Sequence, residues 1–227
     1  MAHKLHPMIV GIRKDLRQIA NPDYARRMQA YMKSEMLYHG IKSAEQTKVK
    51  QKWFKEFPVA SFNEYIELIQ DLWAADFREE RYVAISLGNK YKKFQTMEAL
   101  PVYQMMIQDG AWWDYVDAIA ANLIGALLKK YPAEMRTVLY QWIEHDDLWL
   151  RRSAILAQLK FKANTDETML FEFCARCMEE KVFWIRKAIG WALREYSKTN
   201  PDSVREFVEK THERMSGVTW REARKYI

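Results

Sequence analysis

The chain has 227 residues, of which 49% are apolar and 29% charged, so it can bury a core and is not a disordered segment. Seven Gly and six Pro are too few for a fold with a tight turn about every ten residues, which favours an all-α protein. Two cysteines cannot form a disulfide scaffold, so we expect a protein of the reducing cytoplasm.

The net charge of +6 permits a nucleic acid or another acidic partner, and its distribution is uneven. Residues 1–148 carry a net charge of +1, whereas residues 149–227 carry +5.

The longest nearly apolar run, residues 118–128, is too short to cross a bilayer, and the N-terminus has no long apolar segment. We therefore expect neither a membrane nor a targeting segment.

Helix-start signals recur along the chain. Each combines a capping residue with Pro at the first helical position or an acid in the first turn, and one segment, Asp109-Gly110, has the character of a helix end. The starts are Asn21-Pro22-Asp23, Ser43-Ala44-Glu45-Gln46, Ser61-Phe62-Asn63-Glu64, Tyr131-Pro132-Ala133-Glu134 and Asn200-Pro201-Asp202. No segment predicts a strand.

A period of about one helix pair organises the sequence. Leu148–Ser153 aligns with Phe183–Ala188, and the same frame places an aromatic residue every 35 or 36 positions. These anchors are Phe77, Trp113, Trp149, Trp184 and Trp220. The period predicts a single domain over residues 1–227, built as a solenoid of degenerate HEAT-like helical repeats.

The repeat frame also aligns charged residues. Three or four positions after each anchor, on the same helical face, the sequence has Arg81, Asp117, Arg152, Lys187 and Arg224. Seven and ten residues after the anchor Trp184, Trp191 and Arg194 lie on the same face. A basic stripe suits successive phosphates of a duplex, which predicts salt-sensitive DNA binding without base reading.

The acid in this stripe needs a separate explanation, because a carboxylate repels phosphate. Asp117 can form a structural ion pair with Arg152 of the next repeat. Alternatively, it can stabilise the positive charge that develops on a sugar when a glycosidic bond breaks. Trp113, four residues earlier, and Trp191 would then flank the sugar, although a Trp that recurs in phase is also typical of core packing.

Other constellations predict no site. Cys174 and Cys177 have the spacing of half a zinc site, but the sequence lacks a second pair, so two helix thiols are expected. The sequence has no phosphate-binding Gly loop, no GxSxG motif and no HExxH motif. We expect neither a metal nor a cofactor.

Three ordered motifs resemble a known family. They are Trp112–Asp117, Trp149–Leu156 and Ala188–Tyr196 followed by Lys198–Pro201, with a further similarity around Tyr31–Lys33 and Gly40-Ile41. Together they are similar to the AlkD-type DNA alkylation-repair glycosylases over nearly the whole chain. The resemblance implies a right-handed all-α solenoid with a concave DNA-binding face.

The resemblance also implies an activity. It is the monofunctional hydrolysis of the N-glycosidic bond of 3-methyladenine and 7-methylguanine in alkylated double-stranded DNA, without a base-flipping pocket, as part of base-excision repair. Such an enzyme would be a monomer, associated with the nucleoid when bound to DNA. Asp117 would match the catalytic carboxylate, and Trp113 and Trp191 the aromatics beside the lesion deoxyribose.

The DNA-binding residues follow from the same matches. Arg152 would contact the DNA backbone beside the lesion, and Tyr31 and Arg194 would be further DNA-facing residues. The basic stripe adds Lys187 and Arg81 as phosphate contacts.

Two alternatives from other functional classes remain open. A solenoid can grip DNA or RNA without chemistry, or it can serve as a scaffold whose basic stripe meets an acidic protein. The first alternative predicts salt-sensitive binding without base release, and the second predicts negligible DNA affinity. A product assay separates the enzyme from both.

Overall fold

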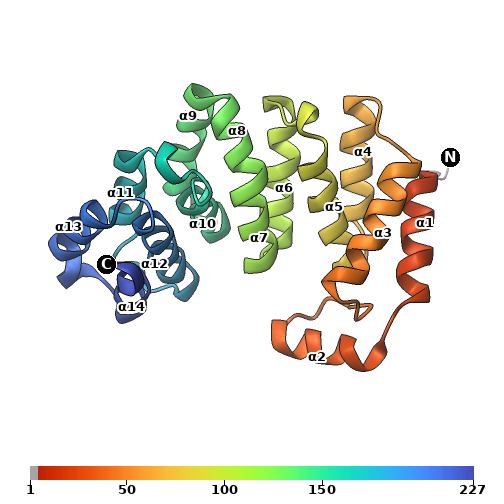
Figure 1. Ribbon diagram of the computed structural model, residues 1–227, viewed down its shortest axis with the longest axis horizontal. Helices are drawn as coiled ribbons and strands as arrows, with labels where there is room; N and C mark the ends of the chain where they lie inside the picture. Colours follow the sequence, from red (N-terminus) through yellow and green to blue (C-terminus); the bar gives the residue numbers. More distant parts are fainter. Residues whose placement is uncertain (1–4) are drawn as a thin grey trace. The chain divides into compact units, whose positions relative to one another are not determined.

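The computed structural model describes residues 5–227, which form two compact units, one ending at residue 95 and the other spanning residues 96–227 (Figure 1). Both units are helical. Within residues 5–227 there is no strand, only an isolated bridge between Leu37 and Phe77, so the prediction of an all-α chain is confirmed. The expectation of one continuous domain stays a prediction.

The described part of the first unit, residues 5–95, contains five α-helices and a short 3-10 turn. The helices are α1 (Pro7–Gln18), α2 (Pro22–Met32), α3 (Ser43–Glu56), α4 (Phe62–Trp73) and α5 (Arg78–Lys90), followed by a 3-10 turn at Lys92–Phe94. Helix α1 packs against α3 and α4, and α5 packs against α3 and α4. Fully buried aliphatic residues such as Ile12 and Leu72 form the core between them.

The segment between α2 and α3 is fastened to α5 by a buried acid. The carboxylate of Glu79 accepts the backbone N–H groups of His39, Gly40 and Ile41 at 2.9–3.2 Å. Gly40 has φ +79°, and a Cβ there would lie 2.1 Å from the carbonyl oxygen of Asn21. Only glycine therefore fits where this segment passes the start of α2.

The second unit is also built from helices. It comprises α6 (Leu100–Gly110), α7 (Trp113–Ile119), a π-helical turn (Ala120–Ile124), α8 (Gly125–Lys130), α9 (Pro132–Ile143), α10 (Leu148–Leu156), α11 (Glu167–Arg176), α12 (Phe183–Ser197), α13 (Pro201–Thr211) and α14 (Gly217–Ala223). Short 3-10 turns lie at Met97–Ala99, Lys162–Asn164, His212–Arg214 and Arg224–Tyr226.

Within this unit, α7, α10, α12 and α14 form a row in which each helix packs on the next. Helix α10 lies between α7 and α12, and α14 packs on α12 (Figure 1). The anchors of the predicted period lie in these helices: Trp113 opens α7, Trp149 and Trp184 are the second residues of α10 and α12, and Trp220 is the fourth residue of α14. The period therefore marks one helix pair, as expected for a helical repeat.

Most predicted helix starts are confirmed by their caps. The side chains of Asn21, Ser61 and Asn200 accept a backbone N–H in the first turns of α2, α4 and α13. The capping box at Ser43 is wrong, because Ser43 is already the first residue of α3 and its N-cap is Lys42. The N-cap hydrogen bond is made by the side chain of the residue before the first turn, so a serine that is itself in the first turn does not make it.

Candidate functional site

Three tryptophans gather at the adjoining ends of α7, α10 and α12. The ring centroids of Trp112 and Trp184 lie 5.4 Å apart, and Trp149 lies 6.3 Å from Trp112 and 6.0 Å from Trp184. The ring contacts come from Trp112, the N-cap residue of α7, and not from the anchor Trp113. The packing role that the period assigned to Trp113 thus belongs to its neighbour.

Asp117 lies on α7 and forms a bidentate ion pair with Arg152 of α10. The Nε of Arg152 donates to Oδ1 at 2.7 Å, and Nη2 donates to Oδ2 at 2.9 Å. The side chain of Asp117 is only 12% exposed and that of Arg152 only 4%. The two planar groups face each other in the arrangement that gives guanidinium–carboxylate pairs their directionality.

The third helix completes this arrangement. The remaining guanidinium nitrogen of Arg152, Nη1, donates to the backbone carbonyl of Trp184 in α12, and its Cζ lies 6.0 Å from the Trp184 ring centroid. A chain of polar contacts therefore crosses α7, α10 and α12. Because both partners are enclosed, the position of the Asp117 carboxylate is fixed by Arg152 and by packing.

Burial has an electrostatic consequence for the carboxyl group. Desolvation raises the pKa of Asp117 above its ordinary value, while the hydrogen bonds and the charge of Arg152 oppose this shift. The nearby charge of Asp114 adds to the increase in pKa. A carboxylate in such a poorly hydrated position acts strongly on any positive charge that approaches it.

The two tryptophans that are predicted to flank the sugar lie on α7 and α12, the helices on either side of α10. Trp113 is one helical turn before Asp117 on α7, and Trp191 lies on α12, seven residues after Trp184. Both side chains are half-buried, so each keeps surface available for a ligand. The roles of Trp113 and Trp191 beside a sugar stay predictions.

Arg152 differs from the solvated stripe residue that the sequence pattern indicates. It is buried, and its guanidinium group is engaged by Asp117 and by the Trp184 carbonyl. The predicted structural ion pair between Asp117 and Arg152 is thus observed. A contact between Arg152 and the DNA backbone stays a prediction and would require one of these partners to be exchanged.

The other two predicted phosphate contacts of this unit share a carboxylate. Lys187 donates to Oε1 of Glu222 at 2.9 Å, and Arg194 bonds to Oε2. Lys225 reaches both oxygens of Glu222 at 3.1 Å. Glu222 and Lys225 were missed by the sequence reasoning, although Glu222 lies 35 residues after Lys187, which is the spacing between Asp117 and Arg152.

The remaining predicted residues belong to the first unit. Tyr31 is 78% exposed on α2, and the guanidinium carbon of Arg81 lies 4.9 Å from the ring centroid of the buried Trp73. Tyr31 is thus accessible to a partner, whereas Arg81 is half-buried against α4. Their DNA contacts stay predictions.

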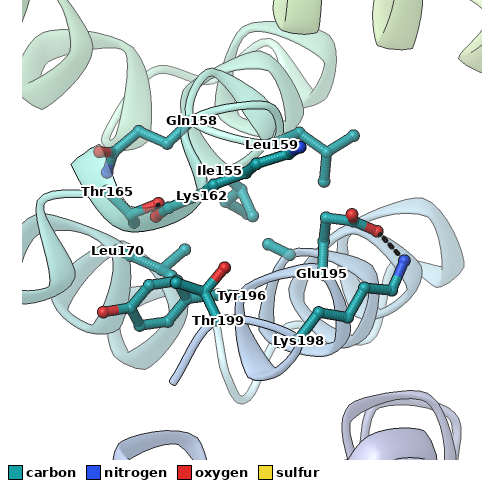
Figure 2. Close-up of a pocket in the computed structure, with 11 residues that line it drawn as sticks. Ile155, Gln158, Leu159, Lys162, Thr165, Leu170, Glu195, Tyr196, Lys198 and Thr199 are labelled. Carbon is teal, nitrogen blue, oxygen red and sulfur yellow. Dashed lines mark hydrogen bonds and ion pairs between the residues drawn. The ribbon is translucent and has the colours of Figure 1, made fainter. Parts of the chain in front are cut away.

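A separate pocket of about 390 Å³ opens between the ends of α10 and α12 (Figure 2). Its lining includes Ile155 and Leu159, and the ion pair between Lys198 and Glu195 spans 2.7 Å at its edge. None of the predicted site residues lines it. Within residues 5–227, no group of three or more His, Cys, Asp or Glu side chains has the geometry to hold a metal ion, and no helix is long and apolar enough to cross a membrane.

Comparisons with known proteins fit this helical architecture. A family model described as DNA alkylation repair enzyme matches residues 12–227. A solved structure titled a predicted DNA alkylation repair enzyme from Enterococcus faecalis superposes with a TM-score of 0.85 at 30% sequence identity, covering 92% of this chain and 96% of that one. No curated protein sequence matches the chain.

Two structures from Streptococcus mutans share the fold at 18% identity. One is titled AlkD2, with a TM-score of 0.63 and coverage of 90% of this chain and 98% of its own. The other is titled smu.31, with a TM-score of 0.62 and coverage of 93% and 99%. These similarities confirm an AlkD-type, HEAT-like helical repeat fold. With its family model extending from residue 12 to residue 227, the chain belongs to the DNA alkylation repair enzyme family.

Proposed function

We propose that this member of a DNA repair family is a monofunctional glycosylase that excises positively charged alkylated purines, 3-methyladenine and 7-methylguanine, from duplex DNA. The observation that carries the proposal is the Asp117 carboxylate, which is held rigidly by Arg152 and only 12% exposed. A poorly hydrated, fixed carboxylate is suited to stabilising positive charge on a sugar.

The chemistry needs little more than this group. An N3- or N7-alkylated purine already carries a positive charge, so it leaves as a neutral base when the C1′–N bond breaks and takes the bonding electrons with it. Asp117 would stabilise the oxocarbenium-like sugar that remains, and water would add to C1′, lose its proton and leave an abasic site.

The two half-buried tryptophans would bracket the deoxyribose. Trp113 precedes Asp117 by one turn, and Trp191 projects from α12, the helix whose Trp184 carbonyl fixes Arg152. Aromatic faces favour a cationic sugar or base over a neutral one. The proposal places the protein as a monomer in the cytoplasm, beside the nucleoid, where its substrate would be alkylated double-stranded DNA.

The test is mass-spectrometric identification of the bases that the protein releases from methylated duplex DNA. Asp117→Asn should lower the rate of release by roughly 100- to 1,000-fold, the usual effect of removing one preorganised electrostatic group. Binding to undamaged duplex should survive, because Asp117 supplies no attraction for phosphate.

Asp114→Asn is the matched control, because it removes the same charge from the first turn of the same helix. Its rate should stay within a few-fold of the wild-type value. A wild-type protein that releases no methylated base would reject the proposed activity and leave a DNA-binding role. Equal rates for Asp117→Asn and Asp114→Asn would reject the role assigned to Asp117.

A further inference from the structure

Three cations of the second unit converge on one carboxylate. Glu222 of α14 is 14% exposed, and its two oxygens accept hydrogen bonds from Lys187 and Arg194 of α12 and from Lys225, which follows α14. The cluster therefore carries three positive charges and one negative charge. Other ion pairs of this unit carry no excess of positive charge: Glu206 with Lys210 is a neutral one-to-one pair, and Arg176 meets two carboxylates, Glu144 and Glu172.

Glu222 reaches the cluster because α14 crosses α12 very closely (Figure 1). A Cβ on Gly190 of α12 would lie only 2.5 Å from the Cβ of Glu222. This close approach places the carboxylate between the side chains of Lys187 and Arg194, each of which lies about one turn from Gly190. Burial raises the pKa of Glu222, but the hydrogen bonds from Lys187 and Lys225 and the surrounding charges lower it to about 2, so the group is ionised at any physiological pH.

The three cations remain accessible despite their shared partner. Their side chains are 37%, 23% and 50% exposed for Lys187, Arg194 and Lys225, whereas Glu222 lies beneath them. A second anion of similar size can therefore reach them from solvent. A phosphodiester oxygen makes the same charge-assisted hydrogen bonds to Lys and Arg as a carboxylate oxygen does.

We propose that Lys187, Arg194 and Lys225 form a binding site for a backbone phosphate of duplex DNA, and that Glu222 is the internal anion with which the phosphate competes. The proposal rests on the DNA-directed function above and adds Lys225 and Glu222 to its residues. Glu222 holds the cations together in the free protein and weakens the grip on DNA, because its negative charge repels the incoming phosphate. The net charge of +2 left in the cluster makes the exchange favourable.

Binding of an undamaged duplex oligonucleotide, measured by fluorescence anisotropy at several salt concentrations, tests this competition without requiring catalysis. Glu222→Gln should bind about fivefold more tightly than the wild type, because the isosteric amide removes the repulsion. Lys225→Met should bind more weakly, and the slope of log K against log salt should become shallower by about one, the effect of losing one phosphate contact.

The exposed pair on α13 supplies matched controls, because Glu206→Gln and Lys210→Met change the net charge equally. If Glu222→Gln folds normally but binds no more tightly than Glu206→Gln, the cluster is only a clamp between α12 and α14, and the proposal is wrong. If Glu222→Gln unfolds, the comparison of Lys225→Met with Lys210→Met decides, and equal affinities and slopes reject the phosphate site. Base release can fail in the separate assay while these binding differences persist, so the two proposals can be rejected independently.

Discussion

The buried ion pair between Asp117 and Arg152 gives the sharpest prediction about stability. Arg152→Met keeps most of the side-chain volume but removes both hydrogen bonds to the Asp117 carboxylate and the one to the Trp184 carbonyl. Because the Asp117 side chain is 12% exposed, its charge is left without a counterion in a poorly hydrated place. Breaking a buried pair in this way costs about 4 kcal/mol, which corresponds to a fall in Tm of about 10 °C for a chain of this size.

The loss of stability in Arg152→Met should grow as the pH rises. Burial already raises the pKa of Asp117, and removal of the opposing Arg152 charge raises it further. A carboxyl group whose pKa is higher in the folded than in the unfolded chain stabilises the fold below its unfolded pKa, and this stabilisation is lost as pH rises through the folded pKa. The loss of stability in Arg152→Met relative to the wild type should therefore be smallest near pH 3.8, the pKa of an Asp side chain in the unfolded chain, and should grow towards neutral pH.

Urea unfolding and thermal scans between pH 4.5 and about 8 measure this deficit. Arg136→Met is the control, since Arg136 and Asp166 form a solvent-exposed pair whose loss should cost about 0–1 kcal/mol. The double variant Arg152→Met/Asp117→Asn should recover much of the stability, because no unpaired charge remains. Equal deficits for Arg152→Met and Arg136→Met, a deficit independent of pH, or a double variant no more stable than Arg152→Met would each refute the reasoning.

Two further predictions concern helix packing and thiol chemistry. Gly190→Ala should lower the free energy of unfolding by about 1–3 kcal/mol in urea, because its Cβ would lie 2.5 Å from the Cβ of Glu222. Gly217→Ala is the control and should leave the stability unchanged, because its Cβ would meet only Arg221 at 3.4 Å. Similar urea midpoints for the two variants would contradict the close crossing of α12 and α14. Cys174 and Cys177 should resist a thiol reagent at pH 8 in the folded protein and react fully in denaturant. The reason is that burial raises the pKa of both thiols, to about 12 for Cys177. Rapid labelling of the folded protein would contradict this prediction, because it would show that the thiols are exposed.

The helices and their repeat could be predicted because the signals are local. Asn21, Ser61 and Asn200 cap helices through hydrogen bonds to residues three positions away, so the relevant geometry is present within a few residues. The aromatic period can be counted directly along the sequence, and each anchor from Trp113 to Trp220 lies within the first four residues of a helix. The error at Ser43 shows the limit of a short motif, because a shift of one residue changes a cap into a first-turn residue.

The candidate site was predicted only in part. The frame placed Asp117 and Arg152 near one another because they are one repeat apart, and the structure joins them directly. The same frame could not show that Trp112 rather than Trp113 would join the tryptophan cluster, because neighbouring positions on a helix differ by about 100° in direction.

The sequence by itself thus determined the helical class and the repeat length, and it supplied the candidate residues for the proposed chemistry. Tertiary structure decided which charges are buried and which carboxylate each cation meets: Arg152 is enclosed between α7 and α12, and Lys187 and Arg194 share Glu222 because α14 crosses α12 closely at Gly190. The physical reason is that a helix cap involves residues within about one turn of chain, and the aromatic period can be counted along the sequence. Burial and pairing depend on how helices about 35 residues apart pack, and therefore on contacts that no local pattern records.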